Sequence, residues 1–322
     1  MFELEYWQRK AASLRLPDQA VIDGQRRAAQ SGQTFAAINP ATGQCLANVA
    51  ACGEEDVNVA VHNARQVFEA GTWAARSPTE RKQVLLRLAD LILENREELA
   101  LLDSLNMGKP VTDAYNIDVP GAAGVFRWYA ESLDKLYDQV APSAQNVLAT
   151  ITREALGVVA AVVPWNFPLD MAAWKLAPAL AAGNSVILKP AEQSPFSALR
   201  LAELALEAGI PAGVLNVLPG LGEQTGKALG LHPDVDCLVF TGSTEVGKYF
   251  MQYSAQSNLK QVWLECGGKS ANLVFADCQD LDLAAEKAAF GIFFNQGEVC
   301  SANSRLLVQR SIHDEFVERL KA

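Results

Sequence analysis

Short apolar runs alternate with amphipathic segments of helical length from residue 157 onward. Strands are predicted at residues 157–163, 185–189, 214–217 and 237–241. Helices are predicted at residues 169–182, 195–208, 223–229 and 244–256. Apolar strands joined by helices are typical of a parallel sheet that helices cover on both faces. The pattern therefore predicts an α/β protein with a doubly wound parallel sheet of the nucleotide-binding kind.

The chain before residue 157 is mainly helical in pattern. Residues 56–70 carry apolar side chains at helical spacing. Ser77-Pro78-Thr79-Glu80 is a capping box with proline at the first helical position. A further helix is expected to end at Gly108, and another to cover residues 120–136. The first 50 residues are mixed, with candidate turns at Asp23-Gly24 and Asn39-Pro40.

A second strand–helix pattern begins after residue 260. Strands are predicted at residues 261–264, 271–275 and 305–309. Helices are predicted at residues 281–294 and from Ser311 onward. These elements predict the beginning of a second α/β layer.

Composition narrows the possible classes of protein. The chain has 322 residues, of which 50% are hydrophobic and 20% charged. At about 150 residues per domain, this predicts two globular domains. The 27 Lys and Arg against 37 Asp and Glu give a formal net charge of −10. Because an acidic surface repels phosphate backbones, nucleic acid is not expected as a partner.

The sequence also argues against a membrane or metal protein. The longest apolar run, residues 157–163, is far below the roughly 20 residues of a membrane span. The opening MFELEYWQRK lacks the apolar core of a signal peptide. Six cysteines without a paired spacing are expected to be thiols of a cytoplasmic protein. With three histidines and no CxxC or HxxxH spacing, no metal site is expected.

Two segments that follow predicted strands could bind a nucleotide. In Thr241-Gly242-Ser243-Thr244 a strand leads into a helix N-terminus, which attracts phosphate. The alternative is an ordinary strand-to-helix turn. Lys189 and Glu192 also follow a strand, where they could bind ribose or phosphate oxygens. The alternative for this pair is a solvated loop.

Two further segments carry a possible oxyanion donor and a possible general base. Asn166 lies between two prolines in Pro164–Pro168 and could donate to a developing oxyanion; the alternative is a rigid turn. Glu265 precedes Gly267 and Gly268, and a carboxylate in a confined place there could act as a general base; the alternative is a turn residue.

Cys300 is the preferred candidate nucleophile, because it follows an apolar helix and a glycine-containing loop. The alternative for any of the six cysteines is an inert buried thiol. Cys266 is a rival, but its neighbour Glu265 disfavours a thiolate. The same argument applies to Glu298, a carboxylate two residues before Cys300 that would disfavour the Cys300 thiolate.

Together these segments resemble the NAD(P)-dependent aldehyde dehydrogenase superfamily. The matching motifs in this chain are PWNFP at 164–168, ILKPAE at 187–192, FTGSTEVG at 240–247, LECGGKSAN at 264–272 and FFNQGEVC at 293–300. Within the superfamily, the chain looks most like γ-glutamyl-γ-aminobutyraldehyde dehydrogenases and related aminoaldehyde enzymes of polyamine catabolism. The resemblance implies an oxidoreductase that converts an aldehyde into a carboxylic acid.

The resemblance also implies catalytic roles. Cys300 matches the nucleophile, which forms a thiohemiacetal and, after hydride transfer to the nicotinamide, a thioester. Asn166, with the Cys300 backbone N–H, matches the oxyanion donor, and Glu265 matches the base that activates water.

Further residues are implied for the cofactor and the substrate. The cofactor positions are Trp165, Lys189, Glu192, Gly222, Gly242, Ser243, Thr244 and Gly247. NAD is expected and NADP is possible, since a carboxylate at Glu192 repels a 2′-phosphate. The substrate-pocket positions are Asp170, Trp174, Phe294, Val299 and Ser301. Asp170 could attract a distal ammonium or guanidinium. The alternative is an aspartate stabilised by its own helix dipole.

The chain departs from the family pattern in two respects. Glu298 stands where the family usually has glutamine. The chain is also shorter than family members and lacks their later glutamate–phenylalanine motif. We therefore expect a C-terminally truncated dehydrogenase, whose parent protein is a homodimer or homotetramer. The alternative is an inactive fragment that binds dinucleotide or a partner protein.

The resemblance predicts this division of the chain. Residues 1–136 and 155–259 form a Rossmann-like NAD-binding domain, and residues 137–154 a small oligomerisation flap. Residues 260–322 are the N-terminal part of an incomplete α/β catalytic domain.

Overall fold

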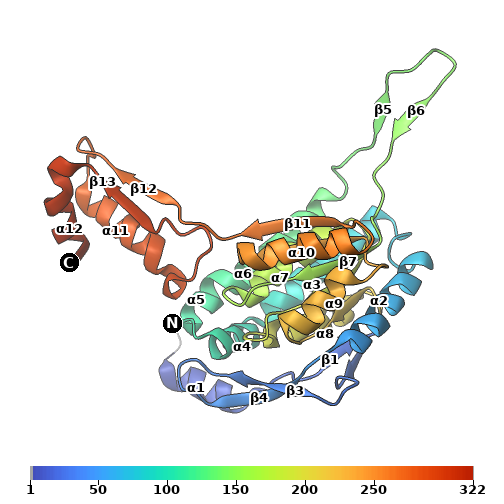
Figure 1. Ribbon diagram of the computed structural model, residues 1–322, viewed down its shortest axis with the longest axis horizontal. Helices are drawn as coiled ribbons and strands as arrows, with labels where there is room; N and C mark the ends of the chain where they lie inside the picture. The colour runs from blue at the N-terminus through green and yellow to red at the C-terminus, as the bar shows by residue number, and fades with distance from the viewer. Residues whose placement is uncertain (1–2, 322) are drawn as a thin grey trace. The chain divides into compact units, whose positions relative to one another are not determined.

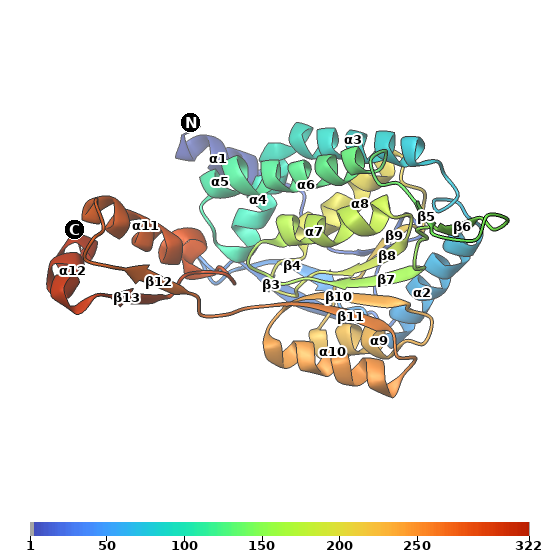
Figure 2. The same cartoon turned by 90° about the horizontal axis from the view of Figure 1, so that it is seen from above.

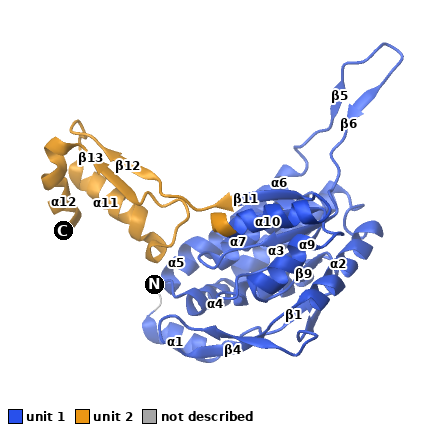
Figure 3. Ribbon diagram, viewed as in Figure 1, with its two compact units in different colours: residues 1–241, 246–264 blue, residues 242–245, 265–322 orange. Residues whose placement is uncertain are grey.

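The computed structural model describes residues 3–321. These residues divide into two compact units (Figure 3). The first comprises the chain up to Thr241 together with residues 246–264. The second comprises residues 242–245 and 265–321.

A twisted sheet forms the centre of the first unit (Figure 1). Across the described chain its strand order is β11-β10-β7-β8-β9-β1-β2. The strands are β1 (Ala20–Ile22), β2 (Gln25–Arg27), β7 (Val158–Val162), β8 (Ser185–Lys189), β9 (Leu215–Val217), β10 (Cys237–Gly242) and β11 (Gln261–Cys266). Strands β10, β7, β8 and β9 are mutually parallel, whereas β1 pairs antiparallel with β9 and with β2. The parallel sheet is confirmed; the antiparallel strands were not predicted, because three residues are too short to show a period.

Helices cover both faces of this sheet, as Figure 2 shows. One face carries α2 (Glu54–Glu69), the π-helix η2 (Gly222–Gly226), α9 (Lys227–Leu231) and α10 (Thr244–Gln256). The other carries α3 (Pro78–Glu94), α4 (Arg96–Met107), α6 (Val119–Ser132), α7 (Pro168–Ala181) and α8 (Phe196–Ala208). Successive residues of β7 pack alternately into the two cores: Val158 and Ala160 on one face, Val159 and Ala161 on the other. Burial on both sides explains why this strand is continuously apolar.

Local capping signals were good guides to the helices of the first unit. Ser77 Oγ accepts from Glu80 N at 3.3 Å, and the Glu80 carboxylate accepts from Ser77 N at 2.9 Å. Helix α4 ends at Gly108, whose φ of 84° favours glycine. Two boundaries were wrong: α6 ends at Ser132 rather than 136, and residues 223–229 form η2 followed by α9.

The remaining elements of the first unit are short. They are α1 (Leu4–Ala12), β3 (Thr34–Ile38), β4 (Cys45–Ala50), α5 (Val111–Asp113), the π-helix η1 (Ala114–Asp118), β5 (Gln139–Ala141) and β6 (Ala149–Ile151). Strands β3 and β4 pair antiparallel, and so do β5 and β6. The hairpin β5–β6 lies within the segment predicted as a flap, and several of its apolar side chains are exposed: Val140, Val147, Leu148 and Ile151.

The second unit has a small core. Parallel strands β12 (Ala271–Val274) and β13 (Arg305–Val308) are accompanied by α11 (Leu281–Phe293) and α12 (His313–Lys321). The single turn η3 (Phe294–Gly297) precedes the loop that contains Cys300, and the single turn η4 (Arg310–Ile312) precedes α12. Its core is formed by Val274, Ala285, Ala288 and Phe316. Within residues 3–321, no helix has the length and apolar character needed to cross a bilayer.

Candidate active site

The sheet brings several candidate segments to one edge. The Asn166 segment follows β7, Lys189 and Glu192 end or follow β8, and Gly222 lies after β9. Gly242 ends β10, and Thr244 begins α10. Because these strands are parallel neighbours, their carboxyl ends lie at the same edge, which is where open α/β sheets bind ligands.

Lys189 and Glu192 form a partly buried ion pair. The Lys189 side chain is 3% exposed, and its Nζ donates to Glu192 Oε2 and to Pro190 O, both at 3.0 Å. Burial lowers the pKa of Lys189, and the charge of Glu192 opposes that shift. The Glu192 side chain is 34% exposed. Because Lys189 is buried, the solvated-loop alternative does not describe it. A buried lysine beside an accessible carboxylate can bind the two hydroxyls of a diol.

A buried asparagine that was not predicted holds this loop. Asn106 on α4 donates from Nδ2 to Gln193 O at 3.1 Å, and its Oδ1 accepts from Phe196 N at 3.0 Å. Ser194 Oγ donates to Trp165 O at 3.2 Å. The loops after β7 and β8 are therefore tied together. The only signal in the sequence was a polar residue on an apolar helix face.

The segment after β7 presents side chains of different exposure. Trp165 is exposed, whereas Asn166 and Phe167 are half-buried. Pro168 is the first residue of α7, so the proline after Asn166 also begins a helix. Residues 165–167 form a bend that leads into α7, and this backbone is compatible with both interpretations of Asn166.

Asp170 is half-buried in the first turn of α7. Its carboxylate accepts a hydrogen bond from the Trp174 side chain one turn later. Burial and the nearby Asp118 raise the pKa of Asp170 to about 6, while Lys109 opposes this. On α6, a Cβ added to Gly121 would lie 3.3 Å from Asp170 Oδ1, so glycine makes room for this carboxylate. The geometry is compatible both with a cation site and with a helix-dipole role.

Cys300 lies in a loop of the second unit that begins with strained backbone. Asn295 and Gln296 have φ of 51° and 56°, in the left-handed region that non-glycine residues rarely adopt. The Cys300 carbonyl accepts from Gly268 N at 3.1 Å. This bond joins the thiol loop to the segment that carries Glu265.

The residues around Cys300 differ in accessibility. Phe294 stacks on Phe290 with ring centroids 5.2 Å apart. Val299 is half-buried and Ser301 is exposed. Glu265, at the end of β11, is exposed. This corrects the expectation that Glu265 sits in a confined place.

Burial separates the six cysteines into two groups. Cys52 and Cys237 are buried. Burial raises the pKa of Cys52 strongly and that of Cys237 to about 11. Both are inert thiols by that measure. The accessible group is Cys45, Cys266, Cys278 and Cys300.

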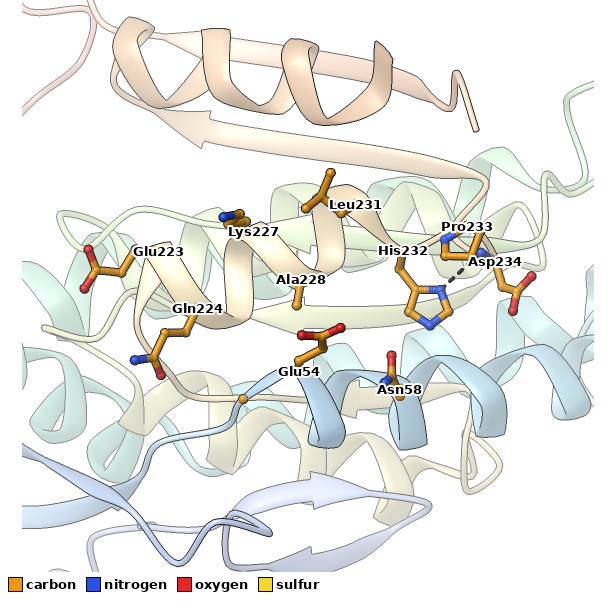
Figure 4. A pocket seen from close by; sticks show the side chains of 11 residues that line it. Glu54, Asn58, Glu223, Gln224, Lys227, Ala228, Leu231, His232, Pro233 and Asp234 are labelled. Atoms are coloured by element: carbon orange, nitrogen blue, oxygen red, sulfur yellow. Dashed lines mark hydrogen bonds between the residues drawn. The ribbon is translucent and has the colours of Figure 1, made fainter. Parts of the chain in front are cut away.

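A separate hollow of about 650 Å³ lies between α2 and the η2–α9 segment (Figure 4). Glu54, Lys227 and His232 line it, and His232 Nδ1 accepts from Asp234 N at 3.1 Å. The hollow is not lined by the predicted site residues. It is therefore distinct from the candidate site.

The fold and these segments define a member of a known family. The family model described as "Aldehyde dehydrogenase family" matches residues 27–322, and the chain belongs to that family. It is 54% identical over 99% of its length to "NADP/NAD-dependent aldehyde dehydrogenase PuuC" of Escherichia coli, of which it covers 64%.

Solved structures agree with this assignment. A γ-glutamyl-γ-aminobutyraldehyde dehydrogenase from Burkholderia cenocepacia is 58% identical, with a TM-score of 0.98 over 99% of this chain and 65% of that one. An indole-3-acetaldehyde dehydrogenase solved in complex with NAD+ is 54% identical, with the same TM-score and coverage. The chain thus spans slightly less than two thirds of the length of these relatives.

Proposed function

We propose that the protein carrying these residues is an NAD(P)-dependent aldehyde dehydrogenase that oxidises an aldehyde to a carboxylic acid. The observation that carries the proposal is the set of loops at the carboxyl edge of β10, β7, β8 and β9. The names of the similar proteins, which include NADP/NAD dependence and an NAD+ complex, support the same reading.

The residues at this edge fit a dinucleotide. Glu192 offers acceptors for ribose hydroxyls, and Lys189 offers a buried donor beside them. At Gly222 an added Cβ would meet nothing within 4 Å, so the backbone there is open to a ligand. Thr241 Oγ1 is buried without a hydrogen-bond partner among the described residues. Ser243 and Thr244 add exposed hydroxyls at the start of α10. Trp165, exposed beside Asn166, and Gly247, buried in α10, complete the proposed cofactor positions.

The proposed chemistry uses three side chains of this chain. The Cys300 thiolate adds to the aldehyde carbon, and a C–S bond forms as the carbonyl electrons move to oxygen. Asn166 donates a hydrogen bond to that oxygen. When bound, NAD(P)+ would accept the hydride released as the C–H bond of that carbon breaks, and a thioester would remain on Cys300. Glu265 takes a proton from the water that attacks the thioester, and the thiolate leaves.

For the substrate, we infer an aldehyde with a distal positive charge, such as an aminoaldehyde. The support is Asp170, ionised at neutral pH because its pKa is about 6, with Trp174 exposed beside it. An aminobutyraldehyde in the name of one similar structure supports this class. The name of the second similar structure contains indole-3-acetaldehyde, which is neutral. A neutral aromatic aldehyde is therefore the competing substrate. Phe294, Val299 and Ser301 are the proposed pocket residues of the second unit.

Steady-state kinetics on the protein at its natural length test both parts. We expect NAD-dependent oxidation of aldehydes that is lost in Cys300→Ala. Asp170→Leu should raise KM for a cationic aldehyde about ten-fold and leave a neutral aldehyde of equal length unchanged. Equal effects on both aldehydes would exclude the charge role. Binding of NAD without turnover of any aldehyde would support the alternative, an inactive dinucleotide-binding protein.

We also propose self-association through the hairpin β5–β6, and a cytoplasmic location supported by six free thiols. The exposed apolar side chains of the hairpin would be covered in a homodimer or homotetramer. Leu148→Asp should then lower the mass measured by light scattering. An unchanged mass would contradict this role for the hairpin.

A further inference from the structure

Lys109 occupies an unusual place for a lysine. It follows the left-handed Gly108 at the end of α4, and its side chain is 0% exposed. Its Nζ donates to the Asp118 carboxylate, which is 2% exposed. The same ammonium lies 4.2 Å from the centroid of the Phe167 ring. A buried cation thus contacts both an anion of η1 and the residue next to Asn166.

The surroundings of Lys109 are rich in carboxylates. Asp103, on the last turns of α4, is 1% exposed and accepts from Leu169 N at 3.4 Å. The charge of Lys109 also acts on Asp118 and on Asp170. Burial raises the pKa of Asp103 to about 7, and Lys109 opposes that rise. Removing the one charge of Lys109 would leave buried carboxylates uncompensated, which is costly.

These contacts bracket Asn166. Phe167 lies against the Lys109 ammonium, and Leu169 N is held by Asp103. On the other side, the carbonyl of Trp165 is held by Ser194. The residues on each side of Asn166 are therefore held by groups outside their own segment, which favours a fixed backbone at Asn166.

We propose that Lys109 is a positioning residue for Asn166, acting through the Phe167 ring and the buried carboxylates. It touches neither substrate nor cofactor in this role. The inference rests on the proposed function, in which Asn166 donates to the oxyanion. It predicts that losing Lys109 impairs turnover much more than cofactor binding.

Four variants of the natural-length protein test the proposal: Lys109→Met, Asn166→Ala, the double variant, and Lys82→Met. Lys82 is the matched control, because it forms an ion pair with Asp134 at 2.6 Å on the surface. We expect Lys109→Met to lower kcat about ten-fold with the Kd for NAD changed less than about two-fold. Lys82→Met should match the wild type. In the Asn166→Ala background, Lys109→Met should lower kcat less than about three-fold, because the group it positions is gone.

Several outcomes would overturn the inference. The first is a wild-type kcat in folded Lys109→Met. The second is a loss of NAD binding in Lys109→Met that equals its loss of kcat. The third is a full ten-fold loss of kcat when Lys109→Met is introduced into the Asn166→Ala background. If Lys109→Met does not fold, Phe167→Leu keeps the buried ion pair and should show the same loss of kcat without loss of NAD binding. An inactive wild type refutes the proposed function itself, and is thereby distinguished from a failure of the Lys109 inference.

Discussion

Asn106 offers the sharpest test of how the candidate cofactor loop is held. Its side chain is buried, and both of its amide atoms bond the turn between Glu192 and α8, at 3.1 Å and 3.0 Å. Asn106→Leu keeps a similar volume but removes both hydrogen bonds. The change therefore isolates the polar contacts from the packing.

The expected change in the free energy of unfolding depends on which groups lose a hydrogen-bond partner. Phe196 is 0% exposed, so its backbone N–H cannot turn to water, at a cost of about 1–3 kcal/mol. Gln193 is exposed, and its carbonyl can be partly solvated, at about 0.5–1.5 kcal/mol. We expect the free energy of unfolding to fall by about 2–4 kcal/mol. Since Glu192 adjoins the loosened turn, the Kd for NAD should also rise about ten-fold.

Urea denaturation measures the first quantity, and fluorescence titration with NAD the second. The midpoint should shift at constant m-value, which reports a stability change rather than a change of denatured state. Asn58→Leu is a matched control, because Asn58 is exposed on α2 and should change stability by less than about 0.5 kcal/mol. If the free energy of unfolding of Asn106→Leu lies within about 0.5 kcal/mol of the wild-type value, the hydrogen bonds of Asn106 do not hold the loop.

Three other predictions concern strain, charge and thiol access. Gly157→Ala places a Cβ against the Asp236 carboxylate, at a residue whose φ is 131°. The free energy of unfolding, measured by thermal denaturation, should therefore fall by about 2–4 kcal/mol. An unchanged Tm would contradict this. Burial raises the pKa of Asp103 in the folded protein to about 7, so its contribution to stability is lost as pH rises from about 4 to 7. Asp103→Asn lacks this titration, so its stability relative to wild type should rise over the same pH range. A parallel pH dependence of the two proteins would refute the assignment. Iodoacetamide followed by mass spectrometry should label Cys300 in the native protein and spare Cys52, and labelling of both at equal rates would show that burial does not protect.

The amino-acid sequence by itself determined the parallel sheet and the positions of the candidate residues along it. Strand β7 is buried on both faces, and every residue in it is apolar, which leaves a continuous apolar run in the sequence. Parallel strands also place their following segments at one edge, so Asn166 and Lys189 could be assigned to that edge from connectivity alone. Capping residues such as Ser77 fixed helix ends because their bonds are local.

The tertiary structure alone decided what supports those residues. Asn106 bonds a loop 87 and 90 residues away, and Asp103 bonds Leu169 across 66 residues. Their sequence neighbourhoods are ordinary helix, because a distant partner leaves no local pattern. Strand β1 was missed because three residues are too short to show a period, and it joins the sheet through one paired position with β9. Periodicity reports which face of an element is buried, whereas the partner of a buried polar group depends on packing between distant segments.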